Sequence, residues 1–163
     1  MKIRATEERD WMLLKEIRLA ALLDTPTAFG VSYKTTITNS DEQWRLRASS
    51  ETHLKFWLAF KNDKAIGMIG AGVDQTGRYN LIAMWVEQES RELGVGESLV
   101  NAVKSEAINR GFKQVFLDVS PDNLKALRFY KKHGFFFISE EKPLASHPEI
   151  VVQTMRWQSM PSI

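Results

Sequence analysis

Between Val86 and Leu99 the chain reads VEQESRELGVGESL. The apolar run that ends at Val86 predicts a buried strand, and the apolar spacing after Gly94 predicts an amphipathic helix. A glycine-bearing loop therefore joins a strand to the start of a helix. The first N–H groups of a helix have no partner within it, and Gly94 and Gly96 would let an anion approach them closely. Arg91 offers a charge-assisted hydrogen bond to the same anion.

This loop alone does not decide between a phosphate site and a tight turn whose glycines only permit positive φ. Two common nucleotide-binding motifs are absent from the sequence. There is no G-x-x-x-x-G-K-S/T motif, and the G-x-G of residues 94–96 lacks the third glycine of a dinucleotide fingerprint. If the loop binds phosphate, the ligand belongs to another class.

A second informative stretch runs from Val119 to Phe135 and reads VSPDNLKALRFYKKHGF. Asn123 stands at the entrance of a predicted short helix, Ala126 follows one turn later, and Phe129 and Tyr130 follow after another turn. Taken singly, these residues fit a helix cap, a packing alanine and core aromatics.

Together, the two stretches resemble the cofactor motifs of the GNAT superfamily of N-acetyltransferases. The motif Q/R-x-x-G-x-G/A is matched by residues 91–96, and N-x-x-A-x-x-F-Y-x-x-x-G-F is matched by residues 123–135. The motifs occur in the family's order and at its usual separation, and the strand and helix order agrees over nearly the whole chain. Two positions depart from the pattern: Gln88 replaces a frequent proline, and Glu92 replaces a frequent glycine beside the expected diphosphate.

The residue pattern predicts one α+β (mixed α/β) domain over residues 1–163. The strand–helix–strand order of residues 79–119 requires a parallel pair within a mixed sheet. The resemblance implies a GNAT-like fold, in which helices flank a mostly antiparallel sheet with a splayed parallel pair. The expected strands are residues 2–6, 53–60, 65–73, 79–87, 114–119, 135–139 and 149–157. The expected helices are residues 7–23, 41–49, 94–110 and 122–133, and residues 28–39 read as irregular.

The resemblance implies transfer of the acetyl group of acetyl-CoA to a primary amine of a small molecule or peptide. The pantetheine arm would pair with the splayed strand near Met84, and a backbone N–H there would polarise the thioester carbonyl. The diphosphate would meet the amides from Arg91 to Glu97. The expected cofactor-binding residues are Met84, Trp85, Val86, Arg91, Glu92, Leu93, Gly94, Val95, Gly96, Glu97, Asn123 and Tyr130.

Tyr130 is the expected catalytic residue. The departing thiol has a pKa near ~8.5 and a tyrosine near ~10, so a phenol is able to protonate the leaving thiolate. The alternative is that Tyr130 only packs against the cofactor. The general base stays open, because Asn80 stands near the position where some family members have a glutamate. Glu87, Glu89 and a chain of water molecules remain as alternatives.

Composition limits the other function classes. The 22 basic and 20 acidic side chains give a net charge of +2, with no run of five like charges, so neither nucleic acid nor a membrane surface is an expected partner. The absence of cysteine excludes a thiolate nucleophile, and the histidine spacing predicts no metal site. We expect a cytoplasmic protein. The family resemblance implies that a homodimer can form and that the acceptor binds near residues 24–47 and 143–151. A CoA-binding sensor that has lost turnover is the alternative function.

Overall fold

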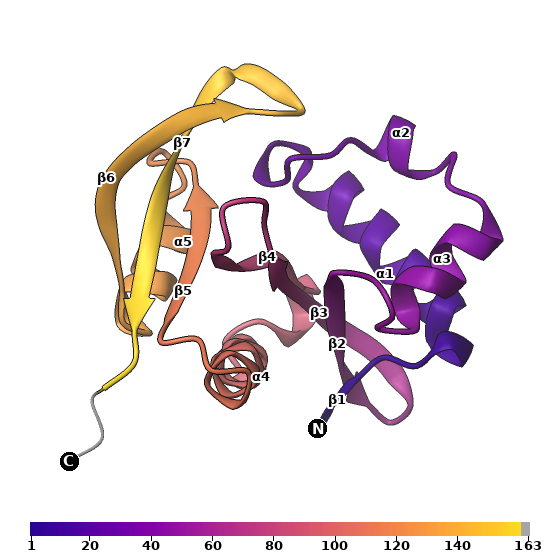
Figure 1. Ribbon diagram of the computed structural model, residues 1–163. Helices are drawn as coiled ribbons and strands as arrows, with labels where there is room; N and C mark the ends of the chain where they lie inside the picture. The colour runs from indigo at the N-terminus through magenta and orange to yellow at the C-terminus, as the bar shows by residue number, and fades with distance from the viewer. Residues whose placement is uncertain (161–163) are drawn as a thin grey trace.

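The computed structural model describes residues 1–160, and the predicted domain range of 1–163 extends beyond them at its last three positions. A single sheet holds seven strands in the order β1-β2-β3-β4-β5-β7-β6 (Figure 1). The strands are β1 (Lys2–Ala5), β2 (Leu54–Lys61), β3 (Lys64–Val73), β4 (Tyr79–Val86), β5 (Gln114–Val119), β6 (Phe135–Leu144) and β7 (His147–Gln158).

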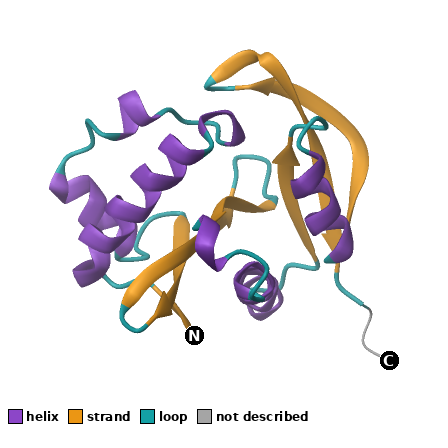
Figure 2. Ribbon diagram, turned by 180° about the vertical axis from the view of Figure 1, so that it is seen from behind, coloured by secondary structure: helices purple, strands orange, loops and turns teal. Residues whose placement is uncertain are grey.

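Helices flank this sheet. They are α1 (Trp11–Asp24), α2 (Tyr33–Thr36), α3 (Asp41–Ala48), α4 (Val95–Asn109) and α5 (Leu124–Lys132), with single 3-10 turns at η1 (Glu8–Asp10), η2 (Pro26–Ala28) and η3 (Gln88–Ser90). Figure 2 shows α5 in front of the strands of the β5–β7–β6 half of the sheet. The mixed α/β architecture confirms the predicted fold class.

The helices cover both faces of the sheet. Successive side chains of a strand point to opposite faces, and β3 shows the consequence. Gly67 faces the Leu99 side chain of α4. The next residue, Met68, packs on the other face in a cluster with Leu14 of α1 and Trp44 of α3. Burial on both faces explains why the middle of β3 is apolar throughout.

β4 and β5 form the only parallel pair among the described strands, and they separate soon after they meet. Their pairing is limited to Asn80 and Phe116, so the rest of β4 has no strand partner on that side. Ala83 has a positive φ of 56°, and the pairing of β3 with β4 shifts register opposite it. Such a bulge bends its strand. The limited pairing and this bulge therefore account for the separation of β4 from β5 in Figure 1.

The C-terminal hairpin is longer than predicted. The expected strands at 135–139 and 149–157 extend in the structure to Leu144 and from His147. Residues 139–143 are exposed, so they show no apolar pattern. Glu141, Lys142 and Pro143 pair with β7, and this pairing extends the strand. At the hairpin tip, the Ser146 hydroxyl donates to the Phe29 carbonyl at 2.6 Å, which joins the two halves of the molecule across the gap.

The N-terminal helical region also differs in detail from the expectation. The predicted helix at 7–23 begins as the 3-10 turn η1 and continues as α1 to Asp24. The segment 28–39, expected to be irregular, contains α2. Ser32 caps this short helix, because its hydroxyl accepts a hydrogen bond from the Thr35 N–H.

Candidate active site

Two cavities lie beside β4 and share part of their walls. The first, here the loop cavity, has a volume of about 620 Å³ and borders the loop between β4 and α4. The second, here the strand cavity, has a volume of about 560 Å³ and lies between β4 and β5. Seven residues line both: Thr25, Ala28, Phe29, Met84, Asn123, Ala126 and Tyr130.

The loop before α4 presents a row of unused backbone donors. The first intrahelical bond of α4 runs from the Ser98 N–H to the Gly94 carbonyl, and no side chain caps this helix. Among the described residues, the N–H groups from Glu92 to Glu97 have no protein acceptor. The positive end of the helix dipole lies behind them. Free N–H groups at the start of a helix are the feature on which the predicted anion site depends.

Two glycines shape this row in different ways. Gly94 has φ of +80°, a conformation that favours glycine, and it turns the chain into α4. At Gly96 the constraint is instead a close approach of other side chains. A Cβ at this position would lie 3.0 Å from the Cε of Met84 and 3.1 Å from the ring of Phe129. Strand β4, helix α4 and helix α5 therefore meet at Gly96.

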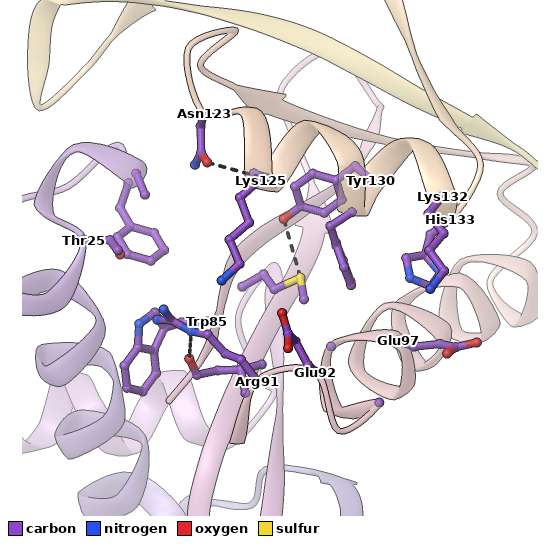
Figure 3. Close-up of a pocket in the computed structure, with 18 residues that line it drawn as sticks. Thr25, Trp85, Arg91, Glu92, Glu97, Asn123, Lys125, Tyr130, Lys132 and His133 are labelled. Atoms are coloured by element: carbon purple, nitrogen blue, oxygen red, sulfur yellow. Dashed lines mark hydrogen bonds between the residues drawn. The ribbon is translucent and has the colours of Figure 1, made fainter. Parts of the chain in front are cut away.

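Tyr130 lies where the two cavities meet. Its hydroxyl donates to the sulfur of Met84 at 3.5 Å, a weak acceptor (Figure 3). Its ring packs edge-on against Phe129 and Phe135. Burial raises the pKa of this phenol well above its usual value, so the hydroxyl keeps its proton at neutral pH. The Tyr130 hydroxyl is thus a protonated donor between the loop cavity and the strand cavity.

Arg91 is held by two protein groups. Its Nε donates to the Val86 carbonyl at 2.8 Å, and its Nη2 donates to Asp24 Oδ2 at 2.8 Å. The same Asp24 oxygen accepts a hydrogen bond from the indole of Trp85 at 2.9 Å. These donors lower the pKa of Asp24, which is therefore a carboxylate at neutral pH. Arg91 still lines the loop cavity, as its predicted role requires.

Comparison with known proteins identifies the family. Residues 17–135 match the sequence model of the Acetyltransferase (GNAT) family. The chain belongs to the GNAT family. Human N-acetyltransferase 8 is 34% identical over 91 residues, which cover 53% of this chain and 40% of that protein. N-alpha-acetyltransferase 50 of Danio rerio is 32% identical over 89 residues, covering 52% of this chain and 53% of that protein. The aligned regions thus span about half the length, or less, of these curated relatives.

Solved structures show the shared fold. A GNAT-family acetyltransferase from Streptococcus pneumoniae superposes with a TM-score of 0.81 at 23% identity, over 98% of this chain and 99% of that chain. The PaiA N-acetyltransferase from Thermoplasma acidophilum, solved in complex with coenzyme A, superposes with a TM-score of 0.72 at 19% identity, over 96% and 98%. The fold of this GNAT chain therefore agrees with theirs over almost its entire length.

Most predicted site residues of the GNAT chain line the loop cavity. They are Met84, Trp85, Val86, Arg91, Glu92, Gly94, Gly96, Glu97, Asn123 and Tyr130. Two side chains do not. Leu93 is 62% exposed to solvent, and Val95 is 2% exposed within the core. Neither residue lines the loop cavity.

Glu92 has an unusual conformation for its residue type. Its φ is +69°, in the region that favours glycine. Its side chain extends into the loop cavity, close to the row of open amides (Figure 3). The sequence identified this acid as a departure from the family pattern, and the structure places its charge at the expected anion site.

Sequence reasoning missed part of the cavity wall. Thr25 and Ala28 lie in the connection after α1, within the segment 24–47 that was expected to bind the acceptor. They also line the loop cavity, and no local signal relates them to residues 84–97. Lys125 of α5 points into the loop cavity (Figure 3). It lies within the motif of residues 123–135, so its place in that motif could have identified it as a site residue. His133 also lines this cavity, and burial lowers its pKa.

The candidates for a general base lie outside both cavities. Asn80 donates to Asp74 at 2.7 Å. Glu87 accepts from the Ser90 hydroxyl at 3.0 Å and lies 3.2 Å from the ammonium of Lys64. Neither Glu87 nor Glu89 is among the described residues that line the two cavities.

Within residues 1–160, no three metal-ligating side chains form a group, and no helix is both long and apolar enough to cross a membrane.

Proposed function

We propose that this GNAT chain transfers the acetyl group of acetyl-CoA to a primary amine of a small molecule or peptide. The observation that carries the proposal is the row of N–H groups from Glu92 to Glu97, which have no protein acceptor among the described residues. Four of these six residues line a cavity of about 620 Å³. In this proposal the diphosphate of acetyl-CoA accepts hydrogen bonds from that row. Arg91 and Lys125 add positive charge at the same cavity.

The unpaired side of β4 supports the position of the pantetheine arm. An extended arm with amide groups is able to pair with a free strand edge as an additional strand would. Met84, Trp85 and Val86 occupy that part of β4, beyond the single pairing of Asn80 with Phe116. The thioester would then lie near Tyr130, and the acceptor amine would enter through the strand cavity.

Tyr130 acts as the general acid in this proposal. The nitrogen of a neutral amine attacks the thioester carbonyl carbon, the C–N bond forms, and the C–S bond breaks. The departing thiolate takes the phenolic proton of Tyr130, the amine loses a proton to solvent, and the tyrosinate regains a proton from solvent. Holding both reactants in adjoining cavities supplies the orientation that the bimolecular reaction lacks in water.

Two measurements test the proposal. Acetyl-CoA at 100 times its Kd should raise the free energy of unfolding by about 2.7 kcal/mol, which a thermal shift assay detects. Thiol release should then follow with at least one amine in a panel of diamines, amino acids, aminoglycosides and peptides. Stabilisation without thiol release from any amine would favour a CoA-binding sensor. Absence of stabilisation would contradict both functions.

Replacing Glu92 with glycine is expected to strengthen both folding and CoA binding. Glycine adopts the positive φ of this position without strain, which should add about 0.5–1 kcal/mol to the free energy of unfolding. Removal of a carboxylate beside the open amides should lower the Kd for CoA about three- to tenfold at low salt. Denaturant unfolding and calorimetric titration measure the two effects.

Glu92→Gln is the matched control, because it removes the charge and keeps the positive φ. It should tighten CoA binding by a similar factor and leave the unfolding free energy unchanged. Weaker CoA binding in Glu92→Gly than in the wild type would show that the carboxylate contributes to the site.

A further inference from the structure

The last residue of α1, Asp24, connects the helical half of the molecule with the end of β4. A single carboxylate oxygen, Oδ2, accepts hydrogen bonds from Arg91 Nη2 at 2.8 Å and from the indole N–H of Trp85 at 2.9 Å. Asp24 lines the strand cavity, whereas Arg91 and Trp85 line the loop cavity. The carboxylate therefore lies at the boundary between the two cavities.

The guanidinium of Arg91 is fixed in both position and orientation. Its Nε is held by the Val86 carbonyl and its Nη2 by Asp24, and two anchors define the plane of this rigid group. Within the described residues, Nη1 makes no hydrogen bond or ion pair with the protein. A guanidinium held in this way needs no reorganisation before it binds an anion.

We propose that Asp24 is a positioning residue that fixes Arg91 to receive the anionic end of the cosubstrate. The inference rests on the proposed function, since it takes the diphosphate of CoA as the anion. Asp24 does not touch the ligand in this account. It acts through Arg91, and its distance of 67 positions along the chain from Arg91 explains why the motif alone does not reveal it.

Two effects of the Asp24 charge oppose each other. A carboxylate repels the diphosphate, and it also orients the guanidinium that attracts it. The Asp24 side chain is 37% exposed, so solvent and salt screen the repulsion. The hydrogen bonds that orient Arg91 depend on contact geometry and are screened less. We therefore expect the loss of orientation to dominate when Asp24 is removed.

The experiment is a double-mutant cycle on CoA affinity, measured by calorimetric titration. Asp24→Ala should raise the Kd for CoA about tenfold in the wild-type background. When it is added to Arg91→Ala, the same substitution should change the Kd by less than twofold, because nothing remains to be oriented. The KM for acetyl-CoA should rise with the Kd, while kcat at saturating acetyl-CoA stays within twofold.

Two variants serve as controls. Asp122→Ala removes another aspartate that lines the strand cavity but makes no contact with Arg91, and its Kd for CoA should stay within twofold of the wild type. Asp24→Asn keeps an oxygen acceptor at the same place, and it should recover most of the lost affinity. If Asp24→Ala does not fold, Asp24→Ser carries the same predictions, because serine is tolerated at a helix end and is too short to reach Arg91.

Two results would overturn the inference: unchanged or tighter CoA binding in Asp24→Ala, or an equal loss in the presence and absence of Arg91. A wild-type chain that does not bind CoA would instead refute the proposed function and this inference together. If the wild type binds CoA but the Asp24 variants do not change its affinity as predicted, this inference is refuted and the proposed function stands.

Discussion

Replacing Tyr130 with phenylalanine is expected to lower kcat about 100-fold and to leave the Kd for CoA within threefold. General acid catalysis contributes about 10²–10⁴ in rate, and the phenol is the proposed proton donor to the thiolate. The substitution removes one oxygen whose only protein partner among the described residues is the Met84 sulfur at 3.5 Å. Folding should therefore be little affected, and the loss should appear in the chemical step.

Tyr79→Phe is the matched control, because it removes a phenolic oxygen from β4 and this tyrosine lines neither cavity. Its kcat should equal that of the wild type.

Burial raises the pKa of Tyr130, so its phenol stays protonated as the pH rises past the usual tyrosine value near ~10. The kcat profile of the wild type should then show no loss on the alkaline side from this group. Full kcat in Tyr130→Phe, under conditions that limit the chemical step, would remove it from the mechanism.

Replacing Gly96 with valine is expected to raise the Kd for CoA at least 30-fold. The new side chain would meet Met84 and Phe129, whose nearest atoms lie 3.0–3.1 Å from the place that its Cβ would take, and it would stand among the open amides. Overpacking of this kind costs about 1–3 kcal/mol of unfolding free energy. Calorimetric titration and denaturant unfolding measure both losses.

Gly30→Val is a suitable control, because a Cβ at Gly30 would meet nothing within 4 Å and its φ is not in the positive range. This variant should bind CoA within twofold of the wild type. If Gly96→Val retained wild-type CoA affinity, the ligand would have to bind away from the start of α4.

Local patterns were sufficient for the parts of the fold that are continuous in sequence. The apolar spacing after Gly94 predicted α4, and the glycine before it predicted the turn with φ of +80°. The same loop predicted open amides, since a helix start without a capping side chain leaves its first N–H groups unused. These features depend on residues within a few positions of one another.

Other features depend on contacts between distant segments. The strand from Ser139 to Pro143 has exposed side chains, and its pairing with β7 cannot be read from its own residues. The walls contributed by Thr25 and Ala28, and the hydrogen bond from Arg91 to Asp24, follow from the packing of α1 beside β4. The splay of β4 from β5 was expected only through the family resemblance, and the positive φ of Ala83 was not expected at all.

The central claim is that the amides from Glu92 to Glu97 bind the diphosphate of coenzyme A. The most direct test is a titration of the ¹⁵N-labelled chain with CoA, followed through the backbone amide resonances. The account predicts that the largest shifts fall on residues 92–97, Gly94 and Gly96 among them, and that they saturate with the calorimetric Kd. Saturable CoA binding that leaves these six amides unshifted would contradict it.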